Sequence, residues 1–502
     1  MPAHSNFDVA IVGAGPAGCL CAILLARAGL RVALIGEPGS ERRIEGVSAR
    51  TLKILADTGL RAHGLLGQGP RRAHWPGLAG TVGDEALVMR PRFDAGLRAD
   101  AVAAGVQALA AVVRGRGERA WFSDRGPIGA ALLIDARGRR APVAADRRRA
   151  PVAIAIAGGG QGQLARTRPS RRSRDDPAAV AYATSSVPSA TMTRATPLGW
   201  CWQAEWGRRA HWTQMVVDAS EFGQPRGGGG SEFGQPRGGG GSEFGRPMGG
   251  GASEFGQPAG GGASEFDQPR GGAAAIWRRF FEQPEAGGFV PMPRHWRARA
   301  ASIQLNPYSL VAGDPMRIGD AAVAFDPLSG HGLFWALASA RMAVPAVLAS
   351  LDGQLALADR FLSRRSRETF LRQARIGRDF HRLAASEFAT AYWSSRCEWP
   401  DSQAAHPPST GPRCEHRVIV HDGRLREAEV LHTMQEPDGV AFVRGLEIAP
   451  LARRLWARPT DDAGRVLAQA LPGADSELRS FLLGWLLSRG VIADSPGHDP
   501  GH

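Results

Sequence analysis

The chain has 502 residues, which excludes a single small module and allows two or three domains with a sizeable core. Its formal net charge is +13, and Lys53 is its only lysine, so arginine carries nearly all of the positive charge. An arginine-rich, basic composition of this kind is typical of biased codon usage. It can also steer an anionic cofactor, an acidic protein or a nucleic acid, but we predict no nucleic-acid partner.

The five cysteines form no CxxC pair and have no zinc-like histidine spacing, so we predict reduced thiols and no metal site. The first residues lack the basic segment of a secretion signal, and no apolar run reaches roughly eighteen residues. These features predict a cytoplasmic protein without a membrane span.

Residues 7–36 give the first strong pattern, a strand, a glycine turn, a helix and a second strand, as at the start of a parallel α/β sheet. The turn has the GxGxxG pattern of dinucleotide binding. Gly13 permits the tight turn, Gly15 lets the backbone approach a pyrophosphate, and Gly18 lets the helix lie close to the strand. The helix start at Pro16 and Ala17 offers unpaired N–H groups to the anion.

The acidic residue expected to bind the adenosine ribose is displaced. Gly36 stands at the end of the second strand and Glu37 follows it. Glu37 can still reach a ribose, and its alternative role is that of a solvated loop carboxylate.

Apolar spacing further predicts a helix at 48–57, a strand leading into a helix at 84–106, and a short buried strand within 130–141. No element is predicted in the Arg-, Ala- and Ser-rich stretch at 142–190.

Residues 220–274 contain an eleven-residue repeat, SEFGQPRGGGG, that recurs with changes. Its glycine and proline content and its single Phe per copy predict a disordered insertion. The PRGGGG pieces resemble RGG segments of RNA-binding proteins. However, the tract has four Arg against six acidic residues, and phosphate binding needs uncompensated cations.

The segment RIGDAAVAFDPLSGHGLFWALA begins at Arg317, about three hundred residues after the glycine turn. In flavoproteins related to aromatic hydroxylases, a strand ending in Gly-Asp places a carboxylate near the ribityl chain, and a helix start then faces the flavin. A helix N-terminus stabilises the negative charge of a reduced flavin. The residues here that match this pattern are Gly319, Asp320, Asp326, Pro327, Gly330 and Gly332.

This second motif favours FAD over NAD, although Asp320 taken alone has the alternative role of a turn carboxylate. His331 lies inside the flavin-facing loop and is the candidate catalytic residue, for proton transfer. Its alternative role is that of a helix-start histidine hydrogen-bonded to backbone.

The motifs together resemble the FAD-dependent monooxygenases and tryptophan halogenases that share the fold of para-hydroxybenzoate hydroxylase. VMRPRFDAGL resembles a family segment that places Arg90 or Arg92 near the cofactor, and LLIDARGRRA resembles its middle segment. The resemblance implies an α/β fold, in which a Rossmann-like FAD-binding domain (1–83, 107–195 and 300–393) is interleaved with an antiparallel-sheet substrate domain (84–106 and 196–299). A linker at 394–417 and a small α-rich C-terminal domain at 418–495, with a hairpin around HDGR, follow from the composition.

The halogenases of this group carry Gly-Trp-x-Trp-x-Ile-Pro and a catalytic lysine. Gly199, Trp200 and Trp202 match the first half, but Ala204 and Glu205 replace Ile-Pro, and Lys53 is not at the family's lysine position.

A closer resemblance is to flavoprotein monooxygenases that act on a tryptophan of another protein during cysteine tryptophylquinone biogenesis. It rests on EGVSART at 45–51, which contains the predicted cofactor residue Arg50, and on DPLSGHGLFWAL, ARIGRDF and GLEIAPL. The resemblance implies FAD as cofactor, dioxygen as co-substrate, a polypeptide that carries the target tryptophan, and NAD(P)H or a separate reductase as electron donor. The alternatives are a halogenase, a degenerate FAD-binding protein and, through the repeat, an RNA-binding protein.

Overall fold

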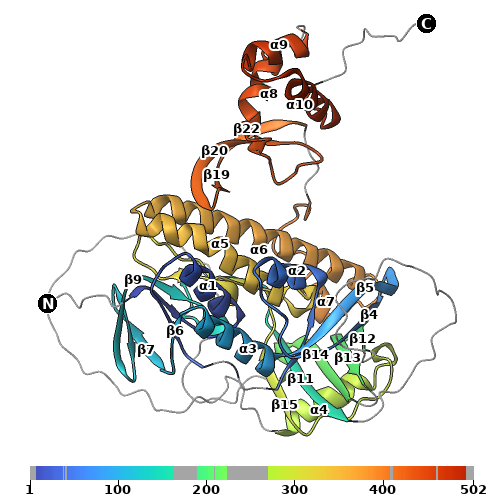
Figure 1. Ribbon diagram of the computed structural model, residues 1–502. Coiled ribbons are helices and arrows are strands. Elements are labelled where there is room, and N and C mark those ends of the chain that lie inside the picture. The colour runs from blue at the N-terminus through green and yellow to red at the C-terminus, as the bar shows by residue number, and fades with distance from the viewer. Residues whose placement is uncertain are drawn as a thin grey trace, which may run out of the picture.

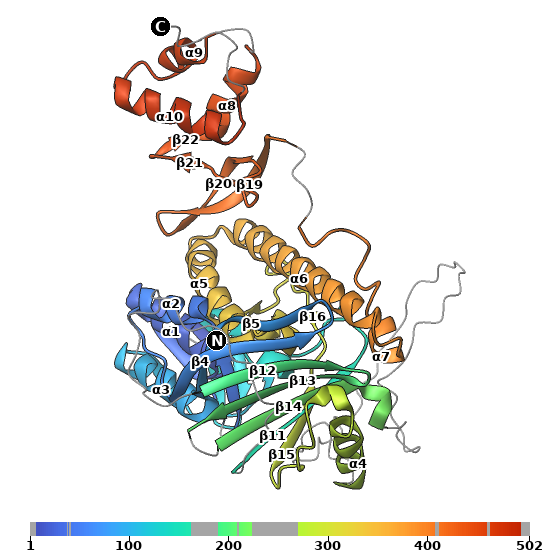
Figure 2. The ribbon, with the colours of Figure 1, turned by 90° about the vertical axis from the view of Figure 1, so that its right-hand side faces the viewer.

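The computed structural model describes residues 7–37, 39, 42–161, 189–207, 210–222, 270–406, 411–458 and 462–492. These residues build two large sheets, a layer of long helices and a C-terminal domain (Figures 1 and 2).

The nucleotide-type sheet has the strand order β6-β2-β1-β9-β8-β7 within the described residues, with β17 also paired to β9. Strands β6, β2, β1, β9 and β17 run parallel to one another, whereas β8 and β7 extend the sheet with antiparallel pairing. Its strands are β1 (Phe7–Val12), β2 (Val32–Ile35), β6 (Gln107–Leu109), β7 (Val113–Arg116), β8 (Ala120–Ser123), β9 (Gly126–Asp135) and β17 (Met316–Arg317). Helices α1 (Pro16–Arg27), α3 (Arg90–Ala103) and α5 (Gly332–Leu351) pack with it around one core.

The second large sheet has the order β15-β11-β14-β13-β12-β4-β5-β3 across the described ranges. Neighbouring strands are antiparallel, except that β12 and β4 are parallel. The strands are β3 (Ile44–Val47), β4 (Leu65–Trp75), β5 (Leu78–Met89), β11 (Ala153–Gln161), β12 (Ser189–Thr196), β13 (Gly199–Trp206), β14 (Ala210–Asp218) and β15 (Trp296–Ala300). Helix α4 (Arg270–Phe281) buries Trp277, Phe280 and Phe281 against one face of this sheet.

Helix α6 (Leu355–Ala385) is the longest described helix, and with α5 it forms the upper layer in Figure 1. Shorter elements join the large ones: α2 (Ala49–Asp57), α7 (Ala391–Ser394), β10 (Arg148–Arg149), β16 (Gln304–Leu305), β18 (Val323–Ala324), and the 3-10 turns η1 (Gly138–Arg140), η2 (Ala219–Phe222), η3 (Pro284–Ala286), η4 (Gly319–Ala321) and η5 (Pro327–Ser329).

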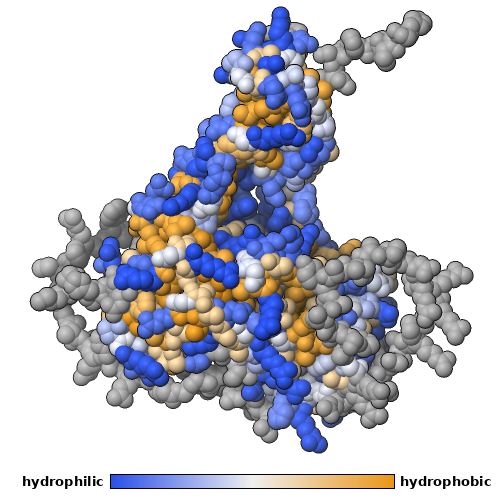
Figure 3. Space-filling view, in the orientation of Figure 1, coloured by the Kyte–Doolittle hydropathy of each residue, from blue (hydrophilic) through white to orange (hydrophobic). Residues whose placement is uncertain are grey.

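The C-terminal domain stands on the α5–α6 layer and projects from the main body (Figures 1 and 3). Its elements are β19 (Arg413–His421), β20 (Arg424–His432), β21 (Phe442–Val443), β22 (Leu446–Glu447), α8 (Ile448–Trp456), α9 (Ala463–Ala470) and α10 (Ser476–Ser488). The domain has its own apolar core, while Leu425 and Val418 of the hairpin pack into the main core.

The structure confirms the predicted fold class and the elements at 7–36, 48–57 and 84–106. The hairpin around HDGR is present as β19 and β20, and it begins at Arg413, inside the predicted linker. The residues at which the chain passes from one large sheet to the other differ from the predicted domain boundaries. β4 and the first half of β5, assigned by sequence to the FAD-binding domain, lie in the eight-stranded sheet, whereas α3, assigned to the substrate domain, packs on α1.

Two segments depart from expectation. β11 occupies 153–161, where no element was predicted. The predicted disordered tract 220–274 is ordered at its edges, because Phe222 and Ala273 pack into the core under α4. The rest of that tract, 223–269, lies outside the described residues, so its predicted disorder stays a prediction.

Among the described helices, α5 is long and apolar enough to cross a membrane. However, 61% of its apolar stretch is buried inside the fold, as core helices also are.

Candidate active site

The first glycine motif forms a cradle at the start of α1. A Cβ atom on Gly13, whose φ is +111°, would lie 2.4 Å from the backbone of Ala136, and one on Gly18 would lie 1.9 Å from the carbonyl oxygen of Gly13. Gly15 differs, because a Cβ there would meet nothing within 4 Å. Gly13 and Gly18 are therefore required by the chain itself, whereas the space at Gly15 fits a group from outside, such as the pyrophosphate of FAD.

The second motif lies directly against the first. A Cβ on Gly319, whose φ is +59°, would lie 2.9 Å from the Cβ of Ala17. The Gly319 N–H donates to Ser339 Oγ over 2.8 Å, and Trp335 Nε1 donates to the Gly319 carbonyl over 3.2 Å. These bonds fix the turn that carries Asp320 to the N-terminus of α1, so the fold brings the two predicted halves of the cofactor site together.

Asp320 faces a cluster of charges. The Arg139 guanidinium lies 3.9 Å from its carboxylate, and burial raises the pKa of Asp320 despite this cation. Glu45 nearby contacts Arg43 at 2.8 Å and Arg90 at 2.9 Å. Burial favours the neutral form of Glu45, but Arg43, Arg90 and Arg299 outweigh it and lower its pKa to about 2.

The remaining predicted contacts lie at the edges of this site. Arg90 is held by Glu45 and, over 3.0 and 3.1 Å, by Asp94. Glu37 is exposed and lies 3.8 Å from Arg98. Arg50 is exposed in the first turn of α2, and its charge acts on His331. FAD contacts by these three residues stay predictions.

The loop before α5 joins the cofactor cradle to a cavity. Asp326 Oδ1 accepts a hydrogen bond from the Leu328 N–H over 2.9 Å, and burial raises the pKa of Asp326 to about 6. Pro327 begins η5, and Gly330 adopts φ +61° beside the Arg71 guanidinium. Helix α5 begins at Gly332, and its N-cap residue is His331. No side-chain capping hydrogen bond is present at this helix start. Burial, followed by Arg71 and Arg50, lowers the pKa of His331 and favours its neutral form.

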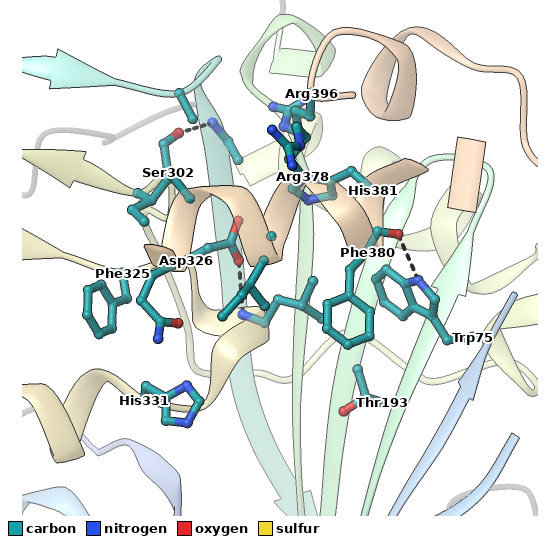
Figure 4. A pocket seen from close by; sticks show the side chains of 18 of the residues that line it. Trp75, Thr193, Ser302, Phe325, Asp326, His331, Arg378, Phe380, His381 and Arg396 are labelled. Carbon is teal, nitrogen blue, oxygen red and sulfur yellow. Dashed lines mark hydrogen bonds between the residues drawn. The ribbon is translucent and has the colours of Figure 1, made fainter. Parts of the chain in front are cut away.

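A cavity of about 300 Å³ lies between this loop, the eight-stranded sheet and α6 (Figure 4). Most of its wall is apolar or aromatic. The lining residues that matter here are Arg71, Trp75, Leu78, Val82, Thr193, Ser302, Phe325, Asp326, Leu328, His331, Arg378, Phe380, His381, Arg396 and Trp399.

Aromatic side chains and neutralised arginines shape the wall. Trp75 Nε1 donates to the Phe380 carbonyl over 3.0 Å, and the Trp75 ring meets Trp393 edge-on at 5.3 Å. Arg396 is buried and pairs with Asp218 at 2.9 Å, and Arg378 pairs with its neighbour Asp379 at 2.8 Å. Carboxylates thus neutralise Arg378 and Arg396, and the aromatic wall around them suits a neutral aromatic group.

Asp326, predicted to bind the cofactor, and His331, the candidate catalytic residue, both line the cavity, and their roles stay predictions. The sequence prediction did not include Trp75, Arg378, His381 and Arg396. The ARIGRDF segment lies in α6, and the spacing of its apolar residues predicts a buried helix face. Nothing local indicates that this face meets β4, which is some three hundred residues earlier.

Residues 6–72 match the family model described as FAD binding domain. With this match, the glycine cradle and the fold, the chain is an FAD-dependent oxidoreductase that has the architecture of flavin monooxygenases and flavin-dependent halogenases.

The chain is similar to the structure described as "Peptidyl tryptophan dihydroxylase QhpG essential for tryptophylquinone cofactor biogenesis". Sequence identity is 29%, the match covers 97% of this chain and 100% of that one, and the TM-score is 0.72. The flavin-dependent halogenase CmlS (16% identity, 99% of this chain and 97% of that chain, TM-score 0.60) and the brominase Bmp2 (18%, 76% and 89%, TM-score 0.51) share the fold. A search of curated proteins finds no match.

Proposed function

We propose that this chain is an FAD-dependent monooxygenase that hydroxylates a tryptophan side chain of a partner polypeptide during tryptophylquinone biogenesis. The observation that carries the proposal is the aromatic-lined cavity, which borders the loop from Asp326 to His331 next to the cofactor cradle. The similarity to QhpG along the whole chain, including the C-terminal domain, supports the choice of substrate.

The cradle residues Gly13, Gly15 and Gly18 would hold the pyrophosphate of FAD, and Asp320 would hold its ribityl chain. When bound and reduced, FAD supplies the activation of dioxygen that yields an electrophilic oxygen. The protein then has to orient the electron-rich ring and exclude water, and the apolar wall around Trp75, Phe325 and Phe380 is suited to both tasks.

Halogenation is the second candidate, and the cavity disfavours it. Lys53, the only lysine of the chain, lies on α2, where its side chain is 74% exposed and pairs with Asp57 at 2.8 Å. Lys53 is not among the cavity-lining residues, so an amine that receives a halogenating species is lacking there. The likeness to CmlS and Bmp2 concerns the fold alone.

A polypeptide substrate agrees with the way the cavity meets the surface. Leu78 and Val82 of β5 line it and are 38% and 42% exposed, so an apolar side chain can enter from outside. The electron donor is NAD(P)H visiting the flavin transiently or a separate reductase, since the sequence has no second GxGxxG motif. A cytoplasmic location stays a prediction.

The test uses the FAD-loaded full chain with reduced nicotinamide, a flavin reductase and dioxygen. The substrate is a polypeptide subunit or peptide with a single tryptophan, and its control has that tryptophan replaced by phenylalanine. Tandem mass spectrometry should locate an added oxygen on the tryptophan. Protein that takes up no FAD overturns the proposal, and a chloride- or bromide-dependent mass gain replaces it with halogenation. FAD binding without any oxygen-dependent turnover indicates a degenerate flavoprotein.

A further inference from the structure

His381 is a buried polar residue in the wall of the cavity. It lies in α6 with 7% of its surface exposed, on the same side as Phe380 and away from Thr193 and His331 in Figure 4. Its protein neighbours are aromatic rings, with centroids at 6.4 Å for Tyr392 and 5.7 Å for Trp393. Its Nε2 atom is buried and has no hydrogen-bond partner.

Three other polar residues of the same wall, Ser302, Arg378 and Arg396, are already bound. Ser302 Oγ accepts from the Ala153 N–H over 2.7 Å and donates to the Pro151 carbonyl over 2.8 Å. Arg378 and Arg396, as guanidinium groups, offer only donors, and both are paired with carboxylates. His381 therefore differs from them in lacking a partner, and burying a polar group without one costs free energy.

The imidazole is also neutral at any ordinary assay pH. Burial, with a smaller contribution from the Arg396 charge, lowers the pKa of His381 to about 3. A neutral imidazole has one acceptor nitrogen, and the tautomer follows from the hydrogen bond made by the other nitrogen. No protein hydrogen bond holds the enclosed Nε2 atom, and His381 lines the cavity, so rotation of the ring about its Cβ–Cγ bond can present an acceptor to a ligand there.

We propose that His381 is a positioning residue that accepts a hydrogen bond from the N–H of an aromatic substrate ring, as in indole. The inference rests on one part of the proposed function, namely that an aromatic side chain of the substrate enters this cavity. It adds that the cavity selects rings with an N–H donor over rings of the same shape without one. A site built around a hydrogen bond rejects an analogue that leaves its buried group unpaired.

The test is a binding titration of the oxidised, FAD-loaded protein with indole and with benzofuran, which has the same shape but no N–H. The readouts are the flavin absorbance and calorimetry. Wild type should bind indole about tenfold more tightly than benzofuran, as one hydrogen bond to a buried neutral group predicts. In His381→Phe the two affinities should become equal, and His381→Gln, which keeps an acceptor, should retain part of the preference.

His74→Phe is the matched control. His74 is exposed on β4 between the cavity residues Ala73 and Trp75, and alternate residues of a strand point to opposite faces. The His74→Phe variant should prefer indole to benzofuran as strongly as wild type does. FAD content and thermal unfolding report whether each variant is folded, and His381→Gln carries the test if the phenylalanine variant does not fold.

Equal wild-type affinities, no wild-type binding of indole, or an indole preference that persists in the folded His381 variants would each overturn the inference. The proposed function fails on a different result, namely absence of tryptophan hydroxylation by protein that still discriminates indole from benzofuran.

Discussion

Substitutions at Gly15 and Gly18 should separate cofactor binding from folding. A Cβ on Gly15 meets nothing within 4 Å, and the backbone there is extended with φ −83°, so Gly15→Val should leave the apoprotein about as stable as wild type. The added methyl groups would fill the space through which the backbone approaches the pyrophosphate. Losing two charge-assisted hydrogen bonds costs about 3 kcal/mol, or roughly a 100-fold weaker FAD affinity.

Gly18→Ala should behave in the opposite way. Its Cβ would lie 1.9 Å from the carbonyl oxygen of Gly13, a backbone atom that moves only if the β1–α1 turn moves. Such overpacking destabilises the folded state by about 3 kcal/mol. Gly484→Ala, inside α10 with nothing within 4 Å, is the control and should gain about 0.5–1 kcal/mol with unchanged FAD binding.

The assays are FAD titration followed by flavin fluorescence and thermal unfolding of the apoproteins. Unchanged FAD affinity in Gly15→Val would refute the assignment of this space to the pyrophosphate. Apoprotein stability lowered as much by Gly15→Val as by Gly18→Ala would refute the distinction between the two glycines.

Three further predictions concern the cavity. Asp326 changes from acid to carboxylate at about pH 6, so kcat/KM should rise with pH through that value if the carboxylate holds the η5 turn. The Asp326→Asn variant should show a flat pH profile of kcat/KM. An unchanged inflection in that variant would exclude Asp326 as its source. His381 has a folded pKa of about 3, below the unfolded value near 6.5, so its contribution to wild-type stability should fall by about 1.4 kcal/mol per pH unit as pH drops through this window. Urea unfolding of His381→Phe should show a slope smaller by that amount, and equal slopes would contradict the buried neutral state. Replacing Leu78 and Val82 together by Asp should raise KM for the polypeptide without changing FAD content, and an unchanged KM would place substrate entry elsewhere.

The glycine geometry of the cofactor cradle was predictable because its requirements are local. Gly13 and Gly18 are dictated by backbone contacts a few residues away or across one strand pair, and such contacts leave a fixed spacing in the sequence. Gly319 and Asp320 were predictable by resemblance, and the structure adds the reason, which is the contact between Gly319 and Ala17.

The cavity was not predictable in the same way. It forms where β4 and β5 meet α6, and the hydrogen bond from Trp75 to Phe380 joins residues 305 positions apart. β11 escaped prediction because AIAIAGGGQ consists of small apolar residues and glycine without polar alternation. It lies between β14 and β15, so both of its edges are paired and most of its side chains are buried. His381 gave no signal, since a histidine on an amphipathic helix is as typical of the surface as of a binding wall.

Hydroxylation of a peptidyl tryptophan can be tested by a single-turnover reaction of the reduced, FAD-loaded protein with a tryptophan-bearing polypeptide under heavy-isotope dioxygen. We expect mass spectrometry to find heavy oxygen on the tryptophan ring and none on a matched polypeptide with phenylalanine in its place. Re-oxidation of the flavin with no oxygen incorporated into the tryptophan, although the polypeptide is bound, would contradict this expectation.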